Sequence, residues 1–210
     1  MFMSASWARP FRYKHTSPAK FYVSNGGQKE VHMMEMSRHI AKFWHSKELE
    51  VKFLELPFTT ENITMIFILP DAKHGLSSMK GTIENYINHK QFSKRKVHIK
   101  LPKFSTQITL DLVSFLKEKG VKSLFNSSAD LSGISLQKGL SVSSLRQKVF
   151  INVTEKGVEA ASATYGIMNK MLQTAKMPEE IEEFIADHPF LFFLREKQNN
   201  MIVFIGQFVG

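Results

Sequence analysis

Short runs of alternating apolar and polar residues, separated by turn residues, dominate this chain. Residues 51–56, 97–101 and 149–153 alternate in this way and predict strands with one buried face, because successive side chains of a strand point to opposite faces. Residues 62–70 are apolar at nearly every position, which predicts a strand buried on both faces.

The C-terminal third adds two apolar runs, at residues 190–194 and 201–205, which predict buried strands on either side of the turn 198–200. Near the other end, Asn25-Gly26-Gly27 predicts a hairpin turn between strands at 21–23 and 31–33, since Asn and Gly tolerate positive φ.

Helical spacing is found in only two places. Apolar residues three and four apart predict a helix over 77–90, with Ser77 as its N-cap, and another over 110–119, ended by Gly120. Strands therefore outnumber helices, and the pattern predicts an α+β fold of mostly antiparallel strands.

One stretch fits no such pattern. Residues 157–188 begin with small side chains, continue with mixed polar residues and include Pro178. A connection of this length is rare in a compact domain and usually has a function of its own or is disordered.

Composition limits the partners and the chemistry. The 210 residues carry a formal charge of +9 and no Cys, which excludes disulfides and thiolate metal sites, and no apolar run is long enough for a membrane span. The densest basic cluster is Lys94-Arg95-Lys96, which we interpret as the outward side of a strand and its loop. The alternative is a site for a heparin-like polyanion, and we expect no nucleic-acid partner.

Searches for catalytic signatures fail. The eight His residues do not form HExxH or another metal-ligand spacing, and GxSxG, P-loop and GxGxxG motifs are missing from the sequence. The sequence predicts a protein without enzymatic activity, metal or cofactor.

Residues 155–164 have an unusual composition. After Glu155 and Gly157, five of the next seven side chains are Ala, Ser or Thr. Such a segment is slim enough to enter a sheet between two strands without overpacking it. Taken alone, these residues are better explained as a flexible linker or the beginning of a helix.

The order of several short motifs resembles the serpin family over essentially the whole chain. These motifs are Trp7 with Pro10 and Phe11, and residues 54–58, 65–70, 97–104, 129–134, 139–143, 155–164, 186–193 and 204–208. The resemblance implies a serpin-like fold of several sheets with an exposed reactive loop, in which 1–210 is a partial domain and 157–188 comprises the loop and the segment after it.

The resemblance also implies a mechanism. The bait loop of a serpin is cut by a serine-type protease, and its freed hinge then inserts into the main sheet before the acyl-enzyme can hydrolyse. The implied hinge residues are Glu155, Gly157, Val158, Glu159, Ala160, Ala161, Ser162, Ala163 and Thr164. The residues implied to control opening of the sheet are Trp7, Lys103 as the ionic partner of Glu155, and Gln147, where most serpins have His.

The family's loop length, counted from Gly157, implies a reactive bond between Met171 and Leu172, suited to a chymotrypsin- or elastase-like protease. Lys170, or Lys176 with Met177, are alternatives suited to a trypsin-like protease. Met171 is preferred because insertion constrains the hinge side of the loop more than its distal side.

The early helices and first strands of the family have no counterpart here. We therefore expect the full-length parent to be a monomeric inhibitor and the isolated 210 residues to be inactive; a non-inhibitory carrier and an inactive fragment are the alternatives. Asn62 and Asn126 lie in glycosylation triplets, whereas the triplet at Asn152 lies inside a predicted strand. We expect a secreted glycoprotein, with a cytoplasmic protein as the alternative.

Overall fold

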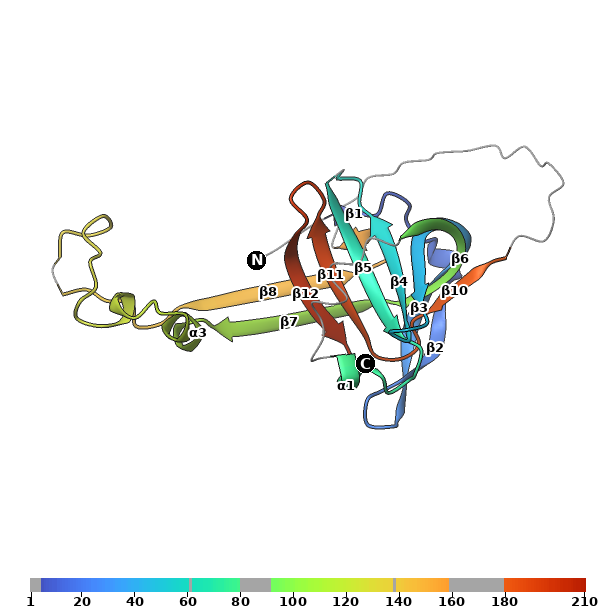
Figure 1. Ribbon diagram of the computed structural model, residues 1–210, viewed down its shortest axis with the longest axis horizontal. Helices are drawn as coiled ribbons and strands as arrows, with labels where there is room; N and C mark the ends of the chain where they lie inside the picture. Colours follow the sequence, from blue (N-terminus) through green and yellow to red (C-terminus); the bar gives the residue numbers. More distant parts are fainter. Residues whose placement is uncertain (1–4, 61, 80–91, 138, 159–179) are drawn as a thin grey trace. The chain divides into compact units, whose positions relative to one another are not determined.

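Figure 1 shows the computed structural model, which describes residues 5–60, 62–79, 92–137, 139–158 and 180–210. The chain forms two compact units. Among the described residues, the larger holds those between 5 and 104 and between 153 and 210, and the smaller holds those between 105 and 152. In the described part of the chain, no helix has the length and apolar character needed to cross a membrane.

An eight-stranded sheet forms most of the larger unit. Its order is β10-β6-β3-β4-β5-β11-β12, and β2 pairs with β3 outside this path. The strands are β2 (Thr16–Tyr22), β3 (Gln28–Ser46), β4 (Val51–Pro57), β5 (Ile63–Pro70), β6 (Ser93–Pro102), β10 (Glu182–Ile185), β11 (Phe190–Glu196) and β12 (Met201–Phe208). A short 3-10 helix η1 (Tyr13–His15) precedes β2. All neighbours in this sheet are antiparallel except β10 and β6, which run parallel.

The predicted hairpin is confirmed, but its second strand is much longer than expected. Gly26 has φ 84° in the turn, and the backbone N–H of Gly27 donates to Asn25 Oδ1 at 3.1 Å. β3 then continues for 19 residues because a bulge between Met36 and His39 shifts its register against β6 and returns the apolar side chains to the core.

Aromatic side chains fill the core of the larger unit. Phe104, Phe190, Phe192 and Phe208 lie with ring centroids between 4.9 and 6.4 Å apart. Fully burying such a side chain stabilises the fold by about 1.5–3 kcal/mol. A second cluster consists of Val51, Phe53, Ile66, Ile68, Leu76, Met79, Leu191 and Phe193.

The predicted strands at 51–56, 62–70, 97–101 and 190–194 are confirmed as β4, β5, β6 and β11. The predicted strand at 201–205 is confirmed as part of β12, but its expected burial is wrong, because β12 is an edge strand and Met201 and Ile205 are exposed. Of the predicted helix 77–90, the structure describes α1 (Leu76–Met79), and the remainder lies outside the described residues.

The smaller unit contains most of β7 (Phe104–Asp111) and β8 (Arg146–Val153), with α3 (Val113–Glu118) and the 3-10 helix η2 (Ser123–Phe125) between them. β8 is confirmed, with Val149, Ile151 and Val153 buried in alternation. The predicted helix 110–119 begins too early, because Leu110 and Asp111 end a strand in which Ile108 and Leu110 share one face.

Candidate functional site

Residues 157 and 158 form the two-residue strand β9 (Gly157–Val158), which lies between β1 (Ala5–Ser6) and the end of β8. Val158 pairs antiparallel with Ala5 on one side and with Val153 on the other, and its side chain is fully buried. The first residues of the implied hinge therefore already lie within a sheet, while residues 159–179 lie outside the described residues.

Only Gly fits at position 157. Its φ is 146°, which side chains rarely adopt, and a Cβ there would collide with the carbonyl oxygen of Ala5 and lie 2.7 Å from Ser6 Cα. The absence of a side chain thus lets β1 approach the point where the chain turns into β9.

A tight turn leads into β9, and Trp7 holds it in place. The N–H of Thr154 donates to Gly157 O at 2.8 Å, and the N–H of Trp7 donates to Lys156 O at 2.8 Å. The indole Nε1 donates to Thr154 O at 2.9 Å, and the ring stacks on Phe58 with centroids 4.6 Å apart. Trp7 is 2% exposed, so it anchors this turn as a buried side chain.

Glu155, in the same turn, is a buried carboxylate with two side-chain partners. Lys103 Nζ lies 3.1 Å from Glu155 Oε2, an ionic contact without good hydrogen-bond alignment, and Thr16 Oγ1 donates to Oε1 at 2.9 Å. The backbone N–H of Phe11 donates to Glu155 O at 2.9 Å. Glu155 is 2% exposed, so the contact with Lys103 differs from an ordinary surface ion pair. We call Trp7, Thr16, Lys103, Glu155 and Gly157 the hinge junction.

These contacts determine the protonation state of Glu155. Burial raises the pKa of this carboxyl, but the hydrogen bond from its own backbone N–H, followed by Lys103 and Thr16, outweighs burial and holds the pKa below its ordinary value of 4.5. Because the folded-state pKa is the lower one, the resulting stabilisation is complete above pH 4.5 and is lost as the pH falls through the lowered pKa.

Replacing Thr16 by Val tests the hydroxyl contact. The variant keeps the shape of the side chain but leaves Glu155 Oε1 buried without its donor, and we expect a loss of about 1.5 kcal/mol in unfolding free energy. Urea unfolding of the full-length protein measures the loss, with Thr106→Val as the control because Thr106 is exposed on β7. Equal stability of the two variants would show that the hydroxyl contributes nothing.

The structure brings together three residues that the sequence pointed to, Trp7, Lys103 and Glu155, and adds Thr16, which the sequence analysis missed. Thr16 and Glu155 are 139 positions apart, and a single Thr at the start of a strand carries no local signal of this contact. Gln147 lies half-buried on β8 in the smaller unit, and its role in a hydrogen-bond cluster stays a prediction.

The other candidate sites stand as follows. Residues 159–164 of the hinge and the reactive-bond candidates Lys170, Met171, Leu172, Lys176 and Met177 lie outside the described residues. Asn62 and Asn126 are exposed, and the Asn126 side chain accepts a hydrogen bond from Ser128 N at 2.8 Å.

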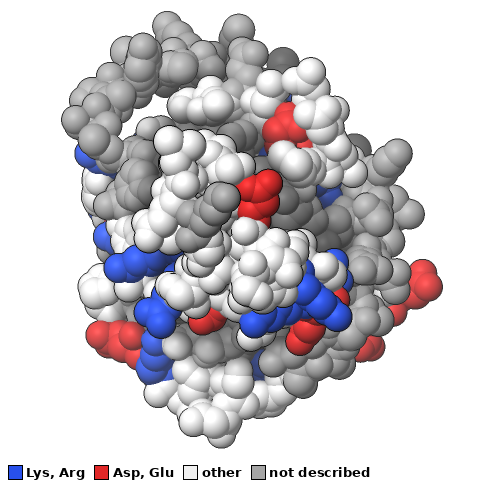
Figure 2. Space-filling model, turned by 90° about the vertical axis from the view of Figure 1, so that its left-hand side faces the viewer, with Lys and Arg blue, Asp and Glu red and all other residues white. Residues whose placement is uncertain are grey.

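The three residues of the basic cluster do not share one surface. In β6, Lys94 pairs with Lys42 and Lys96 with Ile40, so Lys94 and Lys96 lie on one face, whereas Arg95 pairs with Ala41 on the other. On the face drawn in Figure 2, Lys and Arg side chains form small separate groups with Asp and Glu among them. This arrangement gives no support to a dedicated polyanion site.

In this protein the short strand β9 begins between β1 and β8 of one sheet. The ion pair between Lys103 and the buried Glu155 lies at the turn where β9 begins. Residues 1–210 match the family described as Serpin (serine protease inhibitor). The chain belongs to the serpin family, with its α+β fold of several sheets.

Relatives agree with this assignment. The chain is 33% identical to human serpin B4 and 34% identical to a leukocyte elastase inhibitor from Sus scrofa, and both alignments cover 99% of the chain. They cover 53% and 56% of those proteins, so the chain spans about half the length of the curated relatives it matches.

Solved structures show the same fold. Serpin48 from the insect Tenebrio molitor superposes with a TM-score of 0.82 at 35% identity, covering 99% of this chain and 53% of Serpin48. Uncleaved ovalbumin superposes with a TM-score of 0.78 at 28% identity, covering 97% of this chain and 51% of ovalbumin.

The expectation of a secreted protein is wrong. The relatives include serpin B4 and leukocyte elastase inhibitors, which are intracellular clade B serpins and point away from secretion. The glycosylation expected at Asn62 and Asn126 loses its basis with this correction, because N-glycans are added to proteins of the secretory route.

Proposed function

We propose that the complete protein inhibits a serine-type protease as a suicide substrate. The observation that carries the proposal is β9, the beginning of a strand between β1 and β8, with the rest of the hinge directly after it in sequence. Cleavage after the hinge would free it to extend β9, and the small side chains at 160–163 would fit between strands at little steric cost.

In the proposed reaction the protease serine attacks the carbonyl carbon of Met171. The amine of Leu172 leaves with a proton, and Met171 stays joined to the serine as an ester. Insertion of the hinge would then move the acylated protease before water can cleave this ester. The function of Glu155 would be to hold the turn closed until that moment, through Lys103 and Thr16.

An elastase- or chymotrypsin-like enzyme is the target class that we propose. Met171 is a long apolar side chain, which suits a protease with an apolar specificity pocket. Relatives of this chain from pig, human and cow are named leukocyte elastase inhibitors, which favours the same class.

The test mixes the full-length protein with elastase, chymotrypsin and trypsin. We expect a complex that resists SDS with elastase or chymotrypsin and a released C-terminal fragment that begins at Leu172. Replacing Met171 by Arg should transfer the complex to trypsin, whose pocket is acidic. Cleavage by all three enzymes without a stable complex would overturn the proposal, and a fragment beginning at Met171 or Met177 would overturn the reactive-bond assignment alone.

A further inference from the structure

Basic side chains are concentrated in the connection between β1 and β2. Four of them are exposed within residues 9–15: Arg9, Arg12, Lys14 and His15. Tyr13 stands among them and is 59% exposed. The sequence has no Asp or Glu before Glu30, so no acidic residue interrupts this segment. We call residues 9–15 the basic connection.

The described acidic residues of the surrounding elements are already paired with other cations. The helix η1, which belongs to the basic connection, packs against β3, where Glu35 contacts His98 at 2.7 Å and lies 3.6 Å from Lys100. Glu155 lies 3.1 Å from Lys103. The acidic residues of β10 are more distant, because β6 separates β10 from β3. These carboxylates therefore leave the charge of the basic connection uncompensated.

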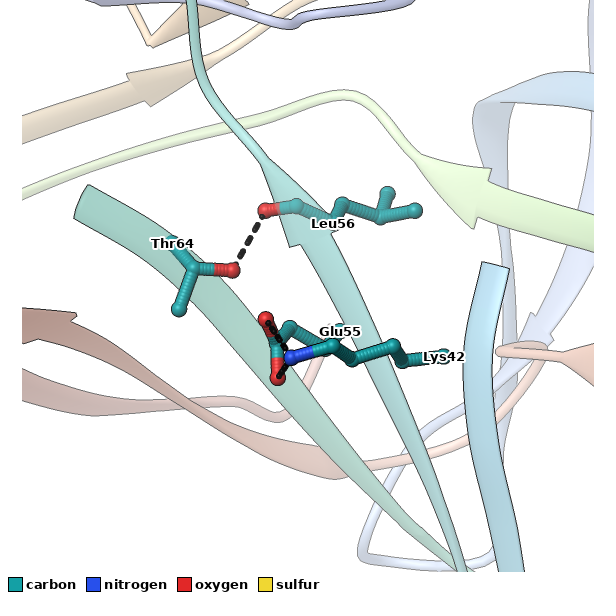
Figure 3. A network of polar contacts seen from close by, with 4 residues as sticks. All are labelled: Lys42, Glu55, Leu56 and Thr64. Carbon is teal, nitrogen blue, oxygen red and sulfur yellow. Dashed lines mark hydrogen bonds and ion pairs between the residues drawn. The ribbon is translucent and has the colours of Figure 1, made fainter. Parts of the chain in front are cut away.

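The Arg and Lys side chains of the basic connection form no ion pair within the described part of the chain. Burial lowers the pKa of His39 to about 4, and the charge of Arg9 adds to this effect, as expected for a guanidinium without a carboxylate beside it. Lys42 is different. Figure 3 shows its side chain extending from β3 to Glu55 of β4, where Nζ lies 3.1 Å from Oε1. The cations of the basic connection are thus available to a partner, whereas Lys42 is neutralised within the fold.

The backbone of the basic connection is tied to the hinge junction. Before it, the N–H of Trp7 donates to Lys156 O at 2.8 Å, and within it the N–H of the buried Phe11 donates to Glu155 O at 2.9 Å. Directly after it, the hydroxyl of Thr16 donates to Glu155 Oε1 at 2.9 Å. An ordered segment loses less entropy when a partner binds, so this surface is preorganised. A partner that binds it in this arrangement also restrains the turn that leads into β9.

The side chains of the basic connection favour a short acidic segment of a protein over a long polyanion. Arg9 and Arg12 can each hold a carboxylate with two parallel N–H donors, and an exposed Tyr such as Tyr13 is typical of protein interfaces. A nucleic acid or a sulfated polysaccharide requires cations that continue along its length, often about 6–10 contacts for DNA. Here the uncompensated charge ends with the connection, because the next basic residue, Lys20, stands opposite Glu30 in the pairing of β2 with β3.

We propose that the basic connection is a docking site for a partner protein that presents a short run of Asp and Glu beside an apolar side chain. The carboxylates would contact Arg9, Arg12 and Lys14, and the apolar side chain would cover the ring of Tyr13. The binding step goes beyond the proposed function and does not depend on it. Its consequence rests on the proposed function: a docked partner would stabilise the closed hinge junction and slow the extension of β9.

The binding experiment uses the full-length protein and two fluorescent peptides at low ionic strength. The acidic peptide is Asp-Glu-Asp-Leu-Glu-Asp-Glu, and its uncharged control has Asn and Gln in place of Asp and Glu. We expect the Kd of the acidic peptide, measured by fluorescence anisotropy, to rise roughly tenfold for Arg12→Ala and roughly fivefold for Tyr13→Ala. A Kd above about 1 mM for the unmodified protein would overturn the docking site.

Lys14→Ala and Lys20→Ala form a matched pair. Each removes one exposed Lys, but Lys20 stands opposite Glu30 and lies outside the basic connection. Lys14→Ala should raise the Kd roughly threefold, and Lys20→Ala should change it by less than about 1.5-fold. Equal losses from the two variants, or equal binding of the acidic and uncharged peptides, would refute the docking site.

Saturating acidic peptide should also slow formation of the SDS-resistant complex by roughly threefold for the unmodified protein, and should leave Arg12→Ala unaffected at the same peptide concentration. If the peptide binds but no protease forms a complex, the proposed function fails and the docking site stands. If the complex forms at the normal rate with the peptide bound, control of the hinge junction is refuted. If Arg12→Ala weakens heparin or a single-stranded oligonucleotide more than it weakens the acidic peptide, the site belongs to a polyanion and the proposal fails.

Discussion

Replacing Val158 by Arg should convert the full-length protein from an inhibitor into a substrate. Val158 is fully buried between Ala5 and Val153. A guanidinium at this position would either be buried without its hydration shell, at a large cost in free energy, or prevent the hinge from entering the sheet. If the variant raises the barrier to insertion by about 2 kcal/mol, insertion slows roughly 30-fold. Hydrolysis of the acyl-enzyme then occurs first, and gels should show cleaved protein in place of the covalent complex.

Val158→Thr is the matched control for this prediction. Thr has nearly the same shape, is β-branched and favours strands, so insertion and complex formation should continue. Covalent complex in normal yield from Val158→Arg would show that β9 does not begin the inserted strand, and the proposed mechanism would lose its main support.

A second large effect is expected from acidification, through His39. This residue lies at the bulge of β3 at 8% exposure, and within the described part of the chain its Nδ1 has no hydrogen-bond partner. Burial, with a smaller contribution from Arg9, lowers the pKa of His39 from 6.5 to about 4. In the unfolded chain His39 therefore becomes protonated below pH 6.5, whereas in the folded chain it becomes protonated only near pH 4.

Stability should accordingly fall as the pH decreases from 6.5, by about 2 kcal/mol at pH ~5 and about 3 kcal/mol at pH ~4. His39→Leu should remove this dependence, because Leu fills the site without a titrating group. The measurement is the urea midpoint of the full-length protein between pH ~7 and pH ~5, above the range in which Glu155 titrates. His32→Leu, an exposed position on the same strand, should keep the slope of the unmodified protein; identical slopes for His39→Leu and the unmodified protein would refute the prediction.

The strands that the sequence predicted well are those with a buried face. β4, β5, β6, β8 and β11 each show the alternating or continuous burial that their apolar residues indicated. β7 was missed because its residues after Phe104 are all exposed and its apolar alternation is limited to Ile108 and Leu110, of which Leu110 was assigned to the helix 110–119. β2 was largely missed because a proline such as Pro18 is unusual within a strand. Pro18 is tolerated here because β2 pairs only with β3, so its other side needs no backbone N–H donors.

The hinge junction was partly accessible from the sequence. Trp7, Lys103 and Glu155 came from the order of family motifs, and the structure places them in contact with one turn. Thr16 and the two-residue strand β9 could not be predicted from the sequence, because both depend on contacts between distant segments, which leave no periodic pattern. Gly157 was implied as a hinge residue by the family resemblance, whereas its close approach to Ala5 is visible only in the folded backbone.

The pairing of Val153 with Val158 determines the register that a longer β9 would have against β8. In an antiparallel ladder, each step forward along one strand is a step back along the other. Ala160 would thus stand opposite Ile151, and Ser162 opposite Val149, on the side where both β8 residues are buried. Ala160 and Ser162 are small, and so are Ala161 and Ala163 on the opposite face, so the sheet would gain a strand that requires little additional volume in its core.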